Sequence, residues 1–188
     1  MRFRQAPILE LSTGVSAQVG SSLFAGNSAV SDGGALFQTE GSLVLKGNSF
    51  LANSSGGGGG AILADGDVSV TGGKFLHNFS GSNGGAIFTK RSSPASAGAL
   101  VVTGTLFQGN ADTNGGGAVR IISGDARIVS CGFYGNAGSM TGGDGGAISI
   151  KPTAGIVTLS TLKVIGNAAG PGGGIWNTGR RPRSPPAQ

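Results

Sequence analysis

Short segments in which every second residue is apolar recur six times along the chain. In each segment two apolar residues lie seven and five positions before a phenylalanine or, in the last copy, a valine. These pairs are Ala17 and Val19, Leu43 and Leu45, Val68 and Val70, Leu100 and Val102, Ala126 and Ile128, and Val157 and Leu159. A spacing of two is typical of a β-strand that buries one face. A small residue three positions before each phenylalanine or valine predicts a bend into the next strand.

Two tetrapeptides accompany each segment at nearly constant distances. The first is Phe-x-x-Asn, and after a short polar gap the second is Gly-Gly-Ala-aliphatic. The first motif occurs at 24–27, 50–53, 75–78, 107–110 and 133–136, and the second at 33–36, 59–62, 84–87, 116–119 and 145–148. A sixth, degenerate copy has Val164 and Asn167, followed by 172–175. Self-similarity with a period of 20 to 50 residues is typical of stacked repeat architectures.

The repeat predicts an all-β fold, a right-handed, single-stranded parallel β-helix of about six turns, or rungs. Each repeat holds three short strands joined by tight corners, and it is too short for the crossover of a βαβ unit. Rungs about 4.8 Å apart would stack the phenylalanines and the aliphatic residues into two inward columns about 29 Å long. The asparagines would stack at a corner, where an amide can bond the backbone and the next rung. We expect a lead-in at 1–12, the β-helix at 13–179 and a disordered, basic, proline-rich tail at 180–188.

Charge and composition narrow the function classes. The net charge of +5 comes from five arginines near the two ends, whereas residues 5–179 hold eight basic and eight acidic side chains. A neutral body does not indicate a nucleic-acid-binding protein. We therefore expect no nucleic-acid partner, and no transmembrane segment, because no apolar run reaches 18 residues. The first residues do not read as a signal peptide.

The two tetrapeptides together resemble the repeats of the chlamydial polymorphic outer-membrane proteins (Pmp-like family) over residues 15–177. In that family such repeats form the right-handed β-helical passenger of an autotransporter, and both tetrapeptides are linked to adhesion. The resemblance therefore implies an adhesin-like passenger at the outer membrane or cell surface, or outside the cell. It also implies that this chain is part of a longer polypeptide, with a host-cell surface or a glycan as partner.

Residues that could carry catalysis or bind a metal do not recur at one place in the repeat. The acidic residues near the corners are Asp32, Glu40, Asp65, Asp67, Asp112, Asp125 and Asp144. They could bind Ca²⁺ or act as a hydrolase pair, but aspartate is also favoured in turns for local reasons. His77 fills a variable position, and Cys131 is a single cysteine without a partner. We therefore expect no catalytic residues, no metal and no cofactor.

The repeat is interrupted at three places, and these interruptions are where we expect partner contact. The longer segments are 90–97, 137–144 and 151–155. Loops in repeat proteins often grow on the binding face. Four basic residues lie in or near these segments, namely Lys90, Arg91, Arg120 and Lys151. The leading hypothesis is a non-enzymatic, surface-displayed or secreted adhesin-like β-helix. The alternatives are a carbohydrate-active or carbohydrate-binding β-helix of the pectate-lyase type, and a degraded reading frame without a function of its own.

Overall fold

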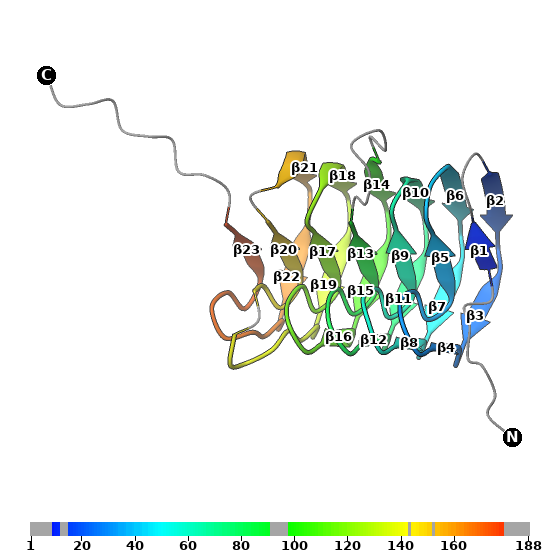
Figure 1. Ribbon diagram of the computed structural model, residues 1–188. Helices are drawn as coiled ribbons and strands as arrows, with labels where there is room; N and C mark the ends of the chain where they lie inside the picture. The colour runs from blue at the N-terminus through cyan, green and yellow to red at the C-terminus, as the bar shows by residue number, and fades with distance from the viewer. Residues whose placement is uncertain (1–8, 12–14, 91–97, 143, 152, 179–188) are drawn as a thin grey trace, which may run out of the picture.

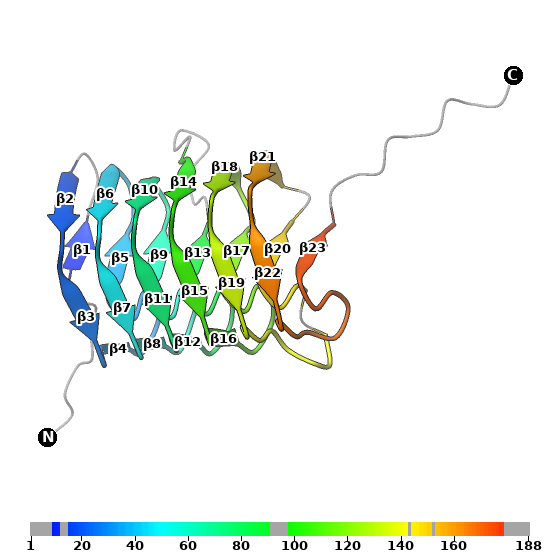
Figure 2. The same cartoon turned by 180° about the vertical axis from the view of Figure 1, so that it is seen from behind.

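The structure is a computed structural model that describes residues 9–11, 15–90, 98–142, 144–151 and 153–178. In these residues the chain coils into a parallel β-helix whose strands stack into four sheets (Figure 1). In Figure 2 the chain descends on the near side and returns upward on the far side as it advances from the N-terminal to the C-terminal end, so the coil is right-handed. The predicted fold class is confirmed.

Sheet A holds the Gly-Gly-Ala-aliphatic strands, sheet B the alternating segments and sheet C the phenylalanines. Sheet A consists of β1 (Leu9–Leu11), β5 (Leu36–Gln38), β9 (Ile62–Ala64), β13 (Ile87–Thr89), β17 (Val119–Ile121), β20 (Ile148–Ile150) and β23 (Ile175–Asn177). Sheet B consists of β2 (Ser16–Gly20), β6 (Ser42–Lys46), β10 (Asp67–Thr71), β14 (Leu100–Thr103), β18 (Gly124–Val129) and β21 (Ala154–Ser160). Sheet C consists of β3 (Leu23–Ala25), β7 (Ser49–Leu51), β11 (Lys74–Leu76), β15 (Leu106–Gln108), β19 (Gly132–Tyr134) and β22 (Lys163–Ile165).

Sheet D is a feature that the sequence pattern did not predict. It consists of β4 (Ser28–Ala29), β8 (Ser54–Ser55), β12 (Phe79–Ser80) and β16 (Ala111–Asp112). These strands directly follow the corner asparagines and pair in parallel like the strands of the other sheets. A strand of two residues is too short to show an alternating pattern, which is why the prediction described this segment only as a turn.

The interior is filled by the predicted columns. The rings of Phe24, Phe50, Phe75, Phe107 and Phe133 stack almost parallel, with centroids 4.6 to 4.9 Å apart. The last four of these rings are fully buried. Stacked aromatic pairs contribute about 0.5–1.5 kcal/mol each beyond the burial of their area. The aliphatic column of sheet A, from Leu36 to Ile148, is buried on the other side of the same core.

The corner asparagines form a continuous ladder of amides, as predicted. Asn53 Oδ1 accepts hydrogen bonds from the backbone N–H and from Nδ2 of Asn27, at 3.1 and 2.7 Å. The same two bonds repeat at every step up to Asn136 and Asn167, where they measure 2.9 and 2.8 Å. The second hydrogen of each interior amide reaches a carbonyl of the preceding rung, as from Asn78 Nδ2 to Phe50 O. The ladder therefore ties each rung to both of its neighbours.

The middle residue of each sheet A strand points away from the core, yet several of these residues are buried. Leu63 and Ser149 have no exposed surface, and Phe88 and Arg120 are only 7% exposed. The loop that leads from the asparagine corner to each glycine pair folds over them. A Cβ at Gly58 would lie 2.1 Å from the Phe88 ring, which shows how closely this loop lies on the outer face. Sheet A therefore lies between the core and a layer of loops.

The predicted division of the chain stays a prediction. Strand β1 lies inside the predicted lead-in and pairs with β5. The predicted tail at 180–188 lies outside the described residues. In the described part, six rungs of sheets B and C are followed by one further strand of sheet A, β23.

Candidate functional site

Lys90 and Lys151 occupy the same corner of the coil, directly after strands β13 and β20 of sheet A. Their backbone N–H groups donate to the carbonyls of Ala64 and Ile121, each in the preceding rung. Ile122 takes the corresponding position between them, because its N–H donates to Thr89 O. The two lysines are thus two rungs apart, about 10 Å along the axis. Arg91, the third predicted contact residue, lies outside the described residues.

Both lysines form ion pairs with aspartates of the loops that cover sheet A. Lys90 Nζ lies 3.2 Å from Asp32 Oδ2, and Lys151 Nζ bonds Asp144 Oδ2. Asp32 also accepts the backbone N–H of Gly58 at 2.6 Å, which fixes its position. The two ammonium groups are therefore partly neutralised, and these partly exposed pairs contribute little stability of their own. An acidic partner would compete with Asp32 and Asp144 for the same groups.

Arg120 lies between the two lysines but beneath the surface. Its Nη2 is 3.5 Å from Asp144 Oδ2, whereas Nε and Nη1 have no hydrogen-bond partner among the described residues. Burial lowers the pKa of Arg120, and the negative charges of Asp144 and Asp112 oppose that change. Its guanidinium therefore holds Asp144 in place from below and does not present its charge to a partner.

Asp112 closes this polar cluster from the side of sheet D. Its Oδ2 accepts the backbone N–H groups of Gly115 and Gly84, at 2.8 and 3.0 Å. Burial raises the pKa of Asp112 to about 6, although both backbone hydrogen bonds and Arg120 act to lower it. The carboxyl group thus changes its charge near neutral pH. Asp112 belongs to the same loop as Gly115, which lies against the Arg120 guanidinium.

A groove of about 360 Å³ follows the bend between sheets B and C, on the opposite side of the coil from this cluster. Its lining includes Thr105, Cys131, Tyr134, Thr161 and Lys163. The Tyr134 ring lies against the backbone of Gly132, where a Cβ would be 2.5 Å from Cε2. Cys131 is buried there, and burial raises the pKa of its thiol. The sequence pattern did not predict this groove. The one feature of the sequence that could have indicated it is Gly132, which leaves room for the Tyr134 ring two positions later.

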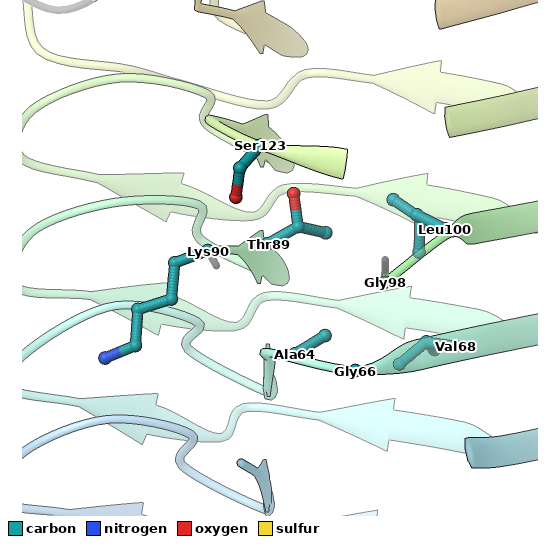
Figure 3. A pocket seen from close by; sticks show the side chains of 8 residues that line it. All are labelled: Ala64, Gly66, Val68, Thr89, Lys90, Gly98, Leu100 and Ser123. Atoms are coloured by element: carbon teal, nitrogen blue, oxygen red, sulfur yellow. The ribbon is translucent and has the colours of Figure 1, made fainter. Parts of the chain in front are cut away.

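A second cavity lies between sheets A and B, beside Lys90. Its volume is about 10 Å³, and its lining includes Ala64, Thr89, Lys90, Leu100 and Ser123 (Figure 3). This volume is enough for one water molecule at most. Figure 3 shows the Lys90 side chain running away from the other lining residues. The cavity is therefore too small to hold a ligand, and Lys90 is directed away from it.

Four of the aspartates accept backbone N–H groups near the corners of the coil. Asp67 Oδ1 accepts the backbone N–H of Ala99 at 2.8 Å, and Asp125 Oδ1 accepts that of Ile156 at 2.7 Å. Asp32 and Asp112 also accept backbone N–H groups. Only the bond from Gly115 to Asp112 is local, as in a turn; the others join neighbouring rungs. His77 is exposed at a corner. Among the residues that the structure describes, no three His, Cys, Asp or Glu side chains lie close enough together to hold a metal ion.

The tetrapeptides that define the repeat are almost entirely inside the coil. The motif asparagines from Asn53 to Asn136 are at most 1% exposed, and the four motif phenylalanines from Phe50 to Phe133 have no exposed surface. The alanines of the Gly-Gly-Ala motifs have no exposed surface. A partner of the folded chain therefore cannot touch these side chains. It can reach the corners, the loops and the outward faces of sheets B and C.

Comparison with known families supports the repeat assignment. The Chlamydia polymorphic membrane protein repeat matches residues 21–39 and 74–90, each spanning a Phe-x-x-Asn and a Gly-Gly-Ala-aliphatic motif. The suspected Pmp-like repeat is therefore confirmed for this chain, and such a repeat suggests a surface-associated protein. No curated protein and no solved structure gave a match. The described residues contain no helix that is long and apolar enough to cross a membrane.

Proposed function

Because the chain carries repeats of the Chlamydia polymorphic membrane protein type, we propose that it is a non-catalytic β-helix of the adhesin-like passenger kind. It would be displayed at the outer membrane or cell surface, or secreted. The observation that carries this proposal is the burial of both motifs, which makes them the framework of a rod. The repeat thereby holds irregular loops at fixed intervals along one side. The stacking of the motifs does not constrain the sequences of those loops.

The contact surface that we propose is the corner that carries Lys90 and Lys151. The sheet holds the backbones of the two lysines two rungs apart, and each ammonium group is paired with one loop carboxylate. Lys90 reaches back to Asp32, before the first tetrad, whereas Lys151 pairs with Asp144, before the fifth. A host-cell glycan or another polyanion with several negative groups along the coil axis could replace Asp32 and Asp144 as their partner. Arg120 would act as a positioning residue, because its guanidinium contacts Asp144.

The test is binding of the immobilised full chain to cultured cells and to an array of acidic glycans. We expect the double substitution Lys90→Ala and Lys151→Ala to lower binding about tenfold and to weaken its dependence on salt. Lys46→Ala is the matched control, because Lys46 is an exposed lysine on sheet B, away from this corner. Binding that resists the double substitution, or that Lys46→Ala lowers equally, would contradict the proposed surface.

A carbohydrate-binding β-helix is the second candidate, and the groove along sheets B and C favours it. Its volume is within the range of small-ligand sites. Tyr134 offers a ring face and a hydroxyl, which suits a sugar. Tyr134→Ala should then abolish glycan binding measured by calorimetry. Leu51→Ala, at the equivalent outward position three rungs away, should leave it unchanged.

An enzyme of the pectate-lyase type would give a different result from either binding protein. The purified chain would shorten acidic polysaccharides, and replacing Asp65 and Asp67 with asparagine would abolish that activity. Under the adhesin proposal, the chain releases no oligosaccharides, and replacing Asp65 and Asp67 with asparagine leaves cell binding intact.

A further inference from the structure

The side chain of Tyr134 lies across a gap in the outer face of sheet C. Leu106, Gly132 and Lys163 share one outward position in the neighbouring strands β15, β19 and β22 (Figure 2). Gly132 has no side chain, and a Cβ there would lie 2.5 Å from Cε2 of Tyr134 and 3.4 Å from its hydroxyl oxygen. The ring therefore takes the place of the missing side chain, between Leu106 and Lys163, and it lines the groove of about 360 Å³.

The charge in this groove is positive. Among the described residues that line it, Lys163 alone carries a charge, because burial raises the pKa of the Cys131 thiol and keeps it neutral. Lys163 is exposed, and in contrast with Lys90 and Lys151 it forms no ion pair with a described residue. No carboxylate of the described chain therefore competes with an external anion for its ammonium group.

The rim of the groove carries hydroxyl groups where the backbone favours glycine. Gly104, Ser130 and Thr161 are equivalent residues of the bend between sheets B and C, and their φ angles are 60°, 54° and 53°. A β-branched residue such as threonine rarely adopts this left-handed conformation. The equivalent residues outside the groove are Gly47, Gly72 and Ser21. The hydroxyls of Ser130 and Thr161 have no hydrogen-bond partner among the described residues, so both are available to a ligand. Backbone strain of this kind is common at binding sites.

We propose that this groove binds a sugar ring that carries a negatively charged group, either a carboxylate or a sulfate. The sugar ring would lie against the Tyr134 ring, and its charged group would pair with the Lys163 ammonium. Its hydroxyls would exchange hydrogen bonds with those of Ser130 and Thr161. Carbohydrate binding, the second candidate function above, is the premise of this proposal, and the charge of Lys163 adds the class of sugar.

The dimensions of the groove suit such a ligand. Neighbouring rungs are about 4.8 Å apart, so a charged group at the edge of a sugar ring over Gly132 is within reach of Lys163. The volume of about 360 Å³ lies at the lower end of the range for small-ligand sites, which fits one or two sugar units. Tyrosine combines an apolar ring with a polar tip, as a sugar combines apolar C–H groups with hydroxyls. A neutral sugar would leave the Lys163 ammonium without a partner.

Calorimetric titration of the full chain with oligomers of glucuronate and galacturonate tests the charge of the ligand. Methyl esters of the same oligomers keep the sugar rings but lose the charge, and sulfated galactose oligomers carry the charge on a different group. We expect at least one of the charged ligands to bind about tenfold more tightly than the esters. The tighter of the two identifies the charged group. Equal affinities for acids, sulfated oligomers and esters would overturn the proposal and leave carbohydrate binding itself standing. Failure of every ligand to bind would overturn both.

Substitution of Lys163 tests where the charged group binds. We expect Lys163→Ala to lower the affinity for the charged ligand about tenfold and to leave that for the esters unchanged. Lys74→Ala is the matched control, because Lys74 holds the same outward position in β11, next to Leu106 and outside the groove. The double substitution Lys90→Ala and Lys151→Ala should also leave this affinity unchanged. A loss in that double variant, with none in Lys163→Ala, would assign the ligand to the corner of the two lysines and overturn the proposal.

Gly132→Ala tests the position of the Tyr134 ring without removing it. The new methyl group would lie 2.5 Å from Cε2, and the half-buried ring can turn away from it toward solvent, so we expect the chain to stay folded. The affinities for charged ligands and for esters should both fall more than about tenfold, because the ring no longer lies between Leu106 and Lys163. Thermal denaturation of the variant checks the fold. Unchanged affinity in a folded Gly132→Ala variant would overturn the role of the ring.

Discussion

Each interior asparagine of the ladder serves three neighbours with one amide. Asn78 Oδ1 accepts from the backbone and side chain of Asn53, while its Nδ2 donates to Phe50 O and to Asn110 Oδ1. All four distances are between 2.9 and 3.0 Å. Because these groups are buried, each must find a partner inside the protein. The recurrence of asparagine at this column follows from that requirement.

Replacing Asn78 with alanine should therefore be costly. The substitution removes one hydrogen bond from each of four buried polar groups, and we expect the free energy of unfolding to fall by about 3 kcal/mol. Asn27→Ala at the first rung removes only the bond from Asn27 Nδ2 to Asn53 Oδ1 and keeps the one from the backbone N–H, so it should cost clearly less. Urea denaturation of both variants measures the difference. Equal losses would show that the ladder does not carry the stability that its geometry implies.

Asp112 should make the stability depend on pH in the opposite sense from an ordinary ion-paired aspartate. Its pKa in the folded chain is raised to about 6 from a usual value of 3.8, so the fold favours the protonated form. Its contribution is fully present below about pH 4 and is lost as the pH rises through 6. The loss is at most about 3 kcal/mol, at 1.36 kcal/mol for each unit of pKa.

Substitution with asparagine tests this assignment. Asparagine can accept the same two backbone N–H groups but does not ionise. We expect Asp112→Asn to be more stable than the parent chain at pH 8 and nearly equal to it at pH 4, in thermal or urea denaturation. A variant that loses stability at pH 8 would show that the charge of Asp112 is needed by Arg120.

At the scale of the strand, the second glycine of each tetrad marks the closest approach of neighbouring rungs. A Cβ at Gly85 would lie 2.2 Å from Gly117 O and 2.5 Å from Ala111 O, both of them backbone atoms. We expect Gly85→Ala to lower the free energy of unfolding by about 3 kcal/mol, since neither strand can move away. Gly104→Ala is the control, because its Cβ would meet no atom within 4 Å and only the positive φ is unfavourable, at about 1 kcal/mol. Similar losses in the two variants would contradict the role of close approach.

Sheets A, B and C were predictable because their side chains repeat in a readable order. The alternating pairs, the phenylalanines and the tetrads each correspond to one sheet, and the columns match the observed register, as for Phe75 and Phe107. The loop layer over sheet A was not predictable. The outward residues that the loops cover include Leu63, Arg120 and Ser149, which share no chemical type. No sequence pattern therefore marks the covered face.

At the scale of the whole molecule, the candidate site was predictable only in part. The sequence placed Lys90 and Lys151 at one kind of corner, and the structure puts them there, two rungs apart. It could not show that Lys90 reaches Asp32, which is 58 residues earlier in the chain. It also could not show that Arg120 lies beneath the loops. Such contacts depend on the reach of long side chains across rungs, for which no period exists in the sequence.

The identity of the hydrogen bonds from rung to rung has a consequence for how such a chain can change over generations. A rung that offers the same asparagine, phenylalanine and tetrad on both sides can be duplicated or deleted without disturbing its neighbours. Unequal recombination between the DNA segments that encode two rungs would therefore still yield a foldable product. Each event would lengthen or shorten the rod by about 4.8 Å. The distance between two surface loops could thus change by whole rungs in the course of evolution, while the packing of the core stays the same.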